Sequence, residues 1–319
     1  MAIMETSQRS SIVFNPGRGG LTGLVLVLGV VCLSACTPEA PPDYDLYENI
    51  RTYAQQTFED NGATARNITD DFNDTDGTDY IVELSPLFRL AFGGAQLEVH
   101  LYANSGGKMA TAAISQFEVP PNSGNFTDAA FVVRPNANLR APFVHGDALK
   151  AMAGMDGSFS MDFYTVDNET NTVDVDEFFG DELETLQEAL ALVEPYQRKE
   201  GEGRGKYTKH LVSFKSQYRI EIQEPDTDDE NERKAYFDAA LGAFQLFMDA
   251  YFVSLDRLEA EDDEVLIQGS INGTDYFIDT LYEEDFAATM GKELFGEDFD
   301  DYFLKGFWRD GKYYSKDAE

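Results

Sequence analysis

The sequence predicts an α+β fold in which an antiparallel sheet is covered by helices. Between residues 80 and 166, apolar residues alternate with polar ones or form short runs, and glycine and asparagine clusters separate the segments. After residue 174, apolar residues recur with helical spacing. Strands followed by helices favour one sheet packed against helices, and no internal repeat indicates a solenoid or a propeller.

The first half of the folded part is predicted to be one helix followed by a meander of strands. Helical spacing of apolar residues indicates an opening helix over 45–59. Alternating or continuous apolar patterns predict strands that include 96–102 and 126–133. Glycine, proline and asparagine at 104–107 and 120–125 predict hairpin connections, so neighbouring strands should be antiparallel.

The second half is predicted to be mainly helical. Apolar residues at helical spacing indicate helices over 178–196, 231–258 and 283–307. Between the last two lies 267–278, which carries Asn272-Gly273 at its centre. An Asn-Gly pair between apolar runs is a strong hairpin signal, so we expect a small hairpin here.

The N-terminal 35 residues have the features of a signal peptide. Residues 21–33 carry no charge and follow two arginines. This stretch is shorter than the roughly 20 residues of a membrane-spanning helix, but it matches the apolar region of a signal peptide. Leu33-Ser34-Ala35-Cys36 resembles the lipobox of bacterial lipoproteins, which implies that Cys36 is the lipidated residue. The alternative is that the apolar stretch is a buried strand or a short anchor.

The sequence therefore divides into a signal peptide (1–35), a lipidated tether (36–43) and a single domain (44–319). The tether contains three prolines and should be an extended spacer. Thr37 stands where an aspartate retains lipoproteins at the inner membrane, so the resemblance implies outer-membrane anchoring. We expect a lipid-anchored protein of the cell envelope that faces the periplasm.

Charge and cysteine content exclude several functions. The chain has 59 acidic and 24 basic residues and a formal net charge of −35, so nucleic acid is excluded as a partner by repulsion. Both cysteines lie within the first 36 residues, which leaves none for a disulfide or a thiolate metal site in the domain. HExxH, GxSxG and phosphate-loop motifs are absent, and we expect no metal site.

One apolar segment carries candidate catalytic groups. Residues 139–149, with the sequence LRAPFVHGDAL, include His145 and Asp147. A carboxyl group buried among apolar side chains retains its proton to higher pH and can protonate a bound substrate. The alternative interpretation is that Asp147 caps a short helix over 150–152.

This segment and its surroundings resemble the ferredoxin-dependent bilin reductases, which reduce open-chain tetrapyrroles. Their central strand reads approximately L-P-x-F-G-x-D, and the matching segment here is 141–149, followed by Met161-Asp162-Phe163. Further partial matches, in the family's order along the chain, are Lys108-Met109, 131–135, Glu284-Asp285, 295–299 and 302–307.

The resemblance implies an α/β/α sandwich, with an antiparallel sheet flanked by helices on both faces. It also implies that a tetrapyrrole lies between the sheet and the C-terminal helices. The family has no cofactor of its own and takes single electrons from ferredoxin, so an external ferredoxin-like electron donor is expected. Asp147 matches the aspartate that protonates the bilin, and we assign it a catalytic role with assistance from His145.

Two family residues are replaced. The catalytic glutamate falls on Ala112 and the catalytic histidine falls on Ala130, and neither alanine can transfer a proton. His145 can stand in for the histidine if the strand is regular, because residues two apart on a strand share a face. The acidic chain should also repel an acidic ferredoxin. Either the electron donor differs or the reductase activity has been lost.

Three functions remain open from the sequence. The first is a bilin reductase-like enzyme. The second is an envelope lipoprotein that binds a tetrapyrrole or another flat apolar ligand without converting it. The third is an acidic lipoprotein with a mechanical or protein-binding role on an inherited fold.

Overall fold

The structure is a computed structural model that describes residues 46–65, 79–82, 96–103, 107–119, 126–150, 157–164, 174–198, 216–284, 288, 289, 292, 307 and 308. The signal peptide, Cys36 and the tether lie outside the described residues. Within the described part of the chain, no helix combines the length and apolarity needed to cross a membrane.

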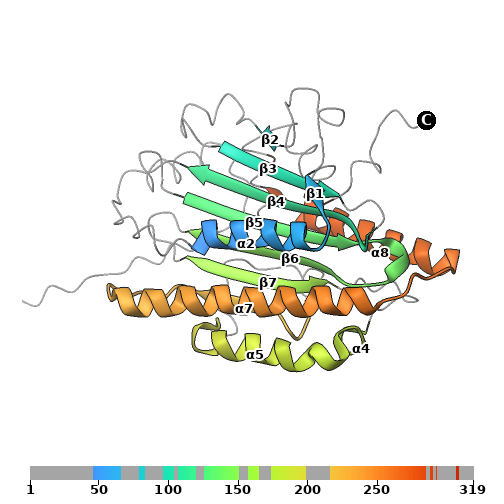
Figure 1. Ribbon diagram of the computed structural model, residues 1–319. Coiled ribbons are helices and arrows are strands. Elements are labelled where there is room, and N and C mark those ends of the chain that lie inside the picture. The colour runs from blue at the N-terminus through green and yellow to red at the C-terminus, as the bar shows by residue number, and fades with distance from the viewer. Residues whose placement is uncertain are drawn as a thin grey trace, which may run out of the picture.

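An antiparallel sheet of eight strands forms the centre of the molecule (Figure 1). The strands are β1 (Thr64–Ala65), β2 (Asp79–Val82), β3 (Gln96–Ala103), β4 (Met109–Val119), β5 (Phe126–Pro135), β6 (Phe143–Lys150), β7 (Ser158–Tyr164) and β8 (Ile220–Gln223). From β3 to β8, strands that follow each other in the chain are neighbours in the sheet, and both β1 and β2 pair with β3. The predicted meander is therefore confirmed.

Helices cover both faces of this sheet (Figure 1). They are α2 (Leu46–Asp60), α4 (Val175–Phe179), α5 (Leu183–Val193), α7 (Glu230–Arg257) and α8 (Glu264–Glu284), with short 3-10 turns η2 (Ala137–Leu139), η3 (Gly180–Glu182) and η4 (Glu194–Tyr196). Helices α2 and α7 lie on one face, and α5 packs against the outer side of α7. Helix α8 lies on the other face, where Phe277 packs against Phe143 at 4.9 Å between ring centroids. The predicted α/β/α sandwich is confirmed.

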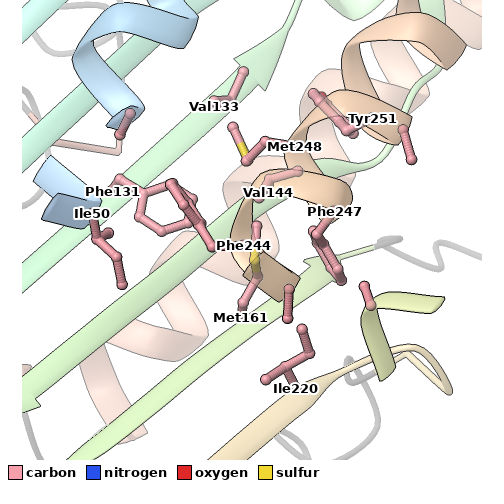
Figure 2. Packing of buried hydrophobic residues seen from close by; sticks show 14 of the residues in the cluster. Ile50, Phe131, Val133, Val144, Met161, Ile220, Phe244, Phe247, Met248 and Tyr251 are labelled. Atoms are coloured by element: carbon pink, nitrogen blue, oxygen red, sulfur yellow. The ribbon is translucent and has the colours of Figure 1, made fainter. Parts of the chain in front are cut away.

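The face under α2 and α7 is an apolar core built around aromatic rings (Figure 2). Phe247 of α7 stacks on Phe163 of β7, with ring centroids 3.9 Å apart. Phe244 contacts Phe131 of β5 edge-on at 5.0 Å. All four side chains are at most 1% exposed. Burial of such rings is the main contribution that holds α7 on the sheet.

Gly146 is required by this core. A Cβ atom at position 146 would lie 2.5 Å from Cζ of Phe131 and 2.9 Å from the carbonyl oxygen of Ser160. Real Cβ atoms do not approach other atoms so closely, so only glycine lets the Phe131 ring pack this close to β6. The glycine of the His-Gly-Asp sequence thus serves packing rather than chemistry.

The opposite face of the sheet carries a second set of buried side chains. Because side chains alternate along a strand, Phe143, His145 and Asp147 of β6 project away from Val144 and Ala148, which belong to the core under α7. Buried apolar residues of neighbouring strands share this second face: Leu97, Val99, Leu101, Ala113 and Val132. We call it the α8 face.

Some of the remaining predictions of helices and strands are confirmed, and others are wrong. The helices over 45–59 and 231–258 and the strands over 96–102 and 126–133 are confirmed. The predicted helix over 178–196 is interrupted at Gly180, which adopts a φ of 52°. Most of the predicted helix over 283–307 lies outside the described residues.

The predicted hairpin over 267–278 is wrong, because this segment belongs to helix α8. Asp263 begins the helix by accepting hydrogen bonds from the backbone N–H groups of Val265 and Leu266. Phe277 and Ile278 are buried along one side of it. Tertiary packing of that side outweighs the turn preference of the Asn-Gly pair.

Candidate functional site

Asp147 lies within strand β6, near the middle of the sheet. Strand β6 runs from Phe143 to Lys150 without a register shift against either neighbour, so the interpretation of Asp147 as a helix cap is wrong. The same regularity places His145 and Asp147 on one face of the sheet. This shared face is the condition under which His145 can stand in for the family's catalytic histidine. Hydrogen bonding to β5 and β7 on both sides keeps this segment extended.

A row of four side chains crosses the α8 face at the level of Asp147. Ala130 of β5 is its register partner on one side, and Ser160 of β7 is its partner on the other. Glu221 of β8 is in turn the register partner of Ser160. Cross-strand partners have Cβ atoms about 4.5–5.5 Å apart, so each side chain can reach the next.

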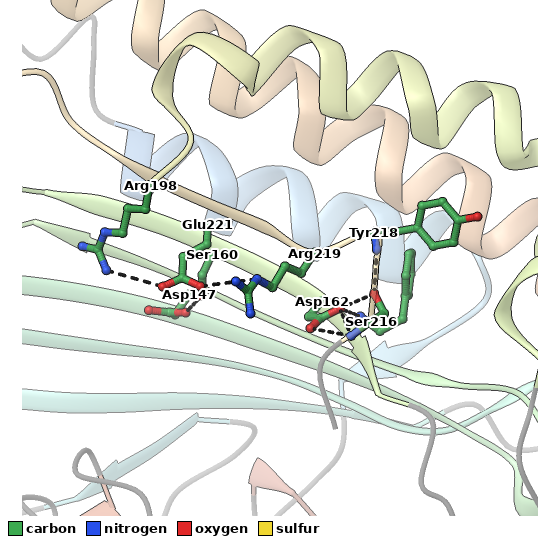
Figure 3. A network of polar contacts seen from close by, with 9 residues as sticks. Asp147, Ser160, Asp162, Arg198, Ser216, Tyr218, Arg219 and Glu221 are labelled. Atoms are coloured by element: carbon green, nitrogen blue, oxygen red, sulfur yellow. Dashed lines mark hydrogen bonds and ion pairs between the residues drawn. The ribbon is translucent and has the colours of Figure 1, made fainter. Parts of the chain in front are cut away.

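Ser160 binds Asp147 directly. Its hydroxyl group donates a hydrogen bond to Oδ1 of Asp147, and the two side chains lie side by side on the sheet (Figure 3). The Asp147 side chain is half-buried. A hydroxyl hydrogen bond to a carboxylate stabilises its ionised form, and this bond joins the Asp147 side chain to the neighbouring strand.

His145 packs against aromatic rings. Its ring centroid lies 4.9 Å from that of Trp308, 6.1 Å from Phe307 and 6.3 Å from Tyr164. Burial lowers the pKa of His145 to about 4, because the charged imidazolium loses its hydration. His145 is therefore neutral at neutral pH, where it can hydrogen-bond to a ligand but cannot supply a proton as imidazolium.

Asp162 is the register partner of His145 on β7, and it is only 4% exposed. Both of its carboxylate oxygens accept hydrogen bonds from the backbone N–H group of Ser216, at 3.2 and 3.1 Å. The Ser216 hydroxyl donates a further bond of 2.5 Å to Oδ1. Asp162, which entered the sequence analysis only through the family motif, therefore fixes the segment that leads into β8.

Two arginines hold Glu221 at the edge of the row (Figure 3). Nη1 of Arg198 lies 3.6 Å from Oε1, and Nε of Arg219 lies 3.6 Å from Oε2. Arg198 also donates through Nε to the side chain of Gln223. Sequence reasoning missed these residues, because the only signal was the alternating Ile220-Glu221-Ile222 pattern beside an acidic region.

The two alanines that replace the family's catalytic residues lie on opposite faces of the sheet. Ala130 is the partner of Asp147 on the α8 face. Ala112 pairs with Val133 and belongs to the core under α2 and α7. Ala112 therefore does not share the face that carries Asp147. A register shift in β4 between Met109 and Thr111 changes which residues face the site.

One pocket lined by described residues reaches the end of this row at Arg219, which pairs with Glu221, and Asp147 is not among its lining residues. It has a volume of about 600 Å³ and opens between α5 and the start of β8. Its lining includes Glu194, Gln197, Ser216 and Arg219. Among the described residues, no cluster of three or more His, Cys, Asp or Glu side chains could hold a metal ion.

Comparisons with known proteins identify the fold. No protein-family model matches the sequence, and no curated protein matches it. Among solved structures, the chain superposes on phytochromobilin synthase from tomato in complex with biliverdin. The TM-score is 0.61, the sequence identity is 16%, and the match covers 83% of each chain. This chain has the fold of a bilin reductase. At this identity the likeness establishes the fold alone.

Proposed function

We propose that this protein binds an open-chain tetrapyrrole on the α8 face of the sheet and reduces it, with Asp147 as proton donor. The position of Asp147 carries the proposal: a half-buried carboxyl group projects from the central strand β6 and is bonded to Ser160. The likeness to a biliverdin-bound reductase across 83% of the chain supports the choice of ligand class.

The reaction requires two electrons and two protons for each double bond that is reduced. The electrons come from an external one-electron donor, ferredoxin-like in its chemistry. Asp147 transfers one proton to a bilin carbon, so its O–H bond breaks, a C–H bond forms and a carboxylate remains. Neutral His145 accepts a hydrogen bond from the bilin or donates one to it. The second proton comes from water. Since this chain is strongly acidic, its donor should present a basic surface.

Biliverdin binding can be followed through one residue. The chain contains a single tryptophan, Trp308, which is 3% exposed and lies beside His145 on the α8 face. A bilin on this face should quench tryptophan emission by energy transfer. We expect saturable quenching when biliverdin is added to the full chain purified in detergent. Unchanged emission together with an unchanged biliverdin spectrum would contradict both the proposed binding and the proposed reduction.

Reduction is tested by substitution of the proton donor. With a chemical one-electron reductant, the wild-type protein should shift the absorption of bound biliverdin. Asp147→Asn should abolish the shift without loss of binding. Asp128→Asn is the matched control, because Asp128 is partly buried on the same face and pairs with Leu149. Equal rates for wild type and Asp147→Asn would contradict the proposed role.

A second candidate is bilin binding without reduction. Ala130, the neighbour of Asp147 across β5, cannot take part in proton transfer, and burial keeps His145 neutral. In this case biliverdin quenches Trp308 emission equally in wild type and Asp147→Asn. Neither protein then changes the bilin spectrum under reductant.

Lipid anchoring at Cys36 is part of the same proposal and rests on the sequence 33–36. Cells that express the full chain with labelled palmitate should incorporate label into the wild-type protein. Cys36→Ala should abolish incorporation, whereas Cys32→Ala should retain it, because residue 32 would be removed with the signal peptide. Incorporation into Cys36→Ala would contradict the assignment. Fractionation of the labelled protein with outer membranes would test its location facing the periplasm.

A further inference from the structure

We propose that Ser160 is a positioning residue for Asp147, and this inference rests on the proposed function. Ser160 holds the Asp147 carboxyl group on the α8 face and stabilises the carboxylate that remains after proton transfer. The observation behind it is the hydrogen bond from the Ser160 hydroxyl to Oδ1 of Asp147, between register partners on adjacent strands.

The row across the sheet explains why this role falls to Ser160. On the β5 side of Asp147 stands Ala130, whose methyl group can neither donate nor accept a hydrogen bond. On the β7 side stands a hydroxyl group, which can do both. Ser160 can donate to the ionised carboxylate and accept from the protonated acid, so it remains a partner of Asp147 in both protonation states.

Glu221 is the competing acceptor for the Ser160 hydroxyl, since it is the register partner of Ser160 on the other side. Each of its carboxylate oxygens faces an arginine: Arg198 lies 3.6 Å from Oε1, and Arg219 lies 3.6 Å from Oε2. The two guanidinium groups form ion pairs with Glu221 at the sheet edge. The Ser160 donor is thereby directed toward Asp147.

Loss of the hydroxyl group should make Asp147 a weaker acid. A hydrogen bond from a hydroxyl group stabilises the carboxylate, so removing it favours the protonated carboxyl group. With Ser160→Ala, Asp147 should therefore hold its proton to higher pH. Ser160→Thr keeps the hydroxyl group and suits a strand, so it should restore wild-type behaviour.

The first test uses the ligand-free protein. Carboxyl ¹³C NMR of the full chain labelled at aspartate, with the Asp147 signal assigned by its loss in Asp147→Asn, follows the titration of this group. We expect Ser160→Ala to move the titration midpoint of Asp147 upward by about one pH unit. Ser160→Thr and the control Ser158→Ala, two residues away on the same strand and face, should leave it unchanged. An unchanged midpoint in Ser160→Ala would overturn the inference, whether or not the protein binds a bilin.

The second test uses the reaction. The rate of the biliverdin spectral change, recorded against pH under a chemical reductant, should lose its alkaline limb at higher pH in Ser160→Ala than in wild type. Ser160→Thr should follow wild type. A rate profile identical in all three proteins, with biliverdin bound and reduced, would refute the role of Ser160 while leaving the proposed function in place. Failure of wild type to bind biliverdin would refute the proposed function instead.

Discussion

The two faces of the sheet use the same strands for different purposes. Under α2 and α7, the strands present apolar side chains such as Phe131 and Phe163, and aromatic rings from α7 fill the space between. On the α8 face the same strands carry His145, Asp147 and Ser160 among apolar neighbours. Stability is concentrated on the first face and polar chemistry on the second. Substitutions on the two faces should therefore have separable effects.

The largest effect is expected in the aromatic core. Phe163 is fully buried and stacks on Phe247, so Phe163→Ala should lower the free energy of unfolding by about 3–5 kcal/mol, since it removes buried area and leaves a cavity. Urea denaturation measures this loss. Leu192→Ala, at a side chain that is 44% exposed, is the control and should change little. A loss below about 1 kcal/mol for Phe163→Ala would mean that this face does not dominate stability.

A smaller loss is expected at the glycine between the two site residues. Gly146→Ala would force a methyl group into the Phe131 ring and the Ser160 carbonyl group, and the overpacking should cost about 2–3 kcal/mol. Denaturation of Gly146→Ala and of the double variant that also carries Phe131→Leu tests the cause. The smaller leucine side chain should recover part of the stability lost in Gly146→Ala. A double variant no more stable than its two separate losses predict would argue against this contact.

The smallest effect concerns the polar face and appears only with pH. The folded-state pKa of His145 is about 4, below the ordinary 6.5, so the unfolded chain binds more protons between these values. His145 therefore lowers stability as pH falls from 6.5 toward 4, and it contributes no such loss above 6.5. Between pH 7 and pH 5 this amounts to about 2 kcal/mol.

His145→Phe removes this titration while keeping a ring against Trp308. The difference in unfolding free energy between pH 7 and pH 5 should shrink by about 2 kcal/mol relative to wild type. His100→Phe is the control, because His100 lies on the other face, beside Ile114 in register. Equal pH dependence in wild type and His145→Phe would show that His145 is hydrated and titrates normally.

Much of the fold could be predicted from local sequence patterns. Alternation revealed strands β3 and β5, and helical periodicity revealed α2 and α7, because each of these elements buries one side. The segment 267–278 was misassigned because Asn272-Gly273 has the preference of a turn, and only contacts such as Phe277 with Phe143 reveal the helix. Such contacts join residues far apart in the chain and leave no local signal.

The site could be predicted only in part, because some of its contacts also join residues far apart in the chain. The motif around 141–149 located His145 and Asp147, and their shared face follows from strand alternation. The face of Ala112 could not be deduced, because counting along β4 crosses the irregularity between Met109 and Thr111. The partners Ser160 and Glu221 come from other strands, and only the register identifies them.

The position of Gly146 between His145 and Asp147 has a consequence for sequence divergence. A one-residue slip of β6 would turn the imidazole group of His145 and the carboxyl group of Asp147 into the aromatic core around Phe131. The glycine therefore fixes the register that keeps both groups on the α8 face. Positions 145 and 147 face the proposed ligand, while positions 144, 146 and 148 are constrained by packing against the core. Homologous chains should therefore retain glycine at 146 even where the residues that face the ligand differ.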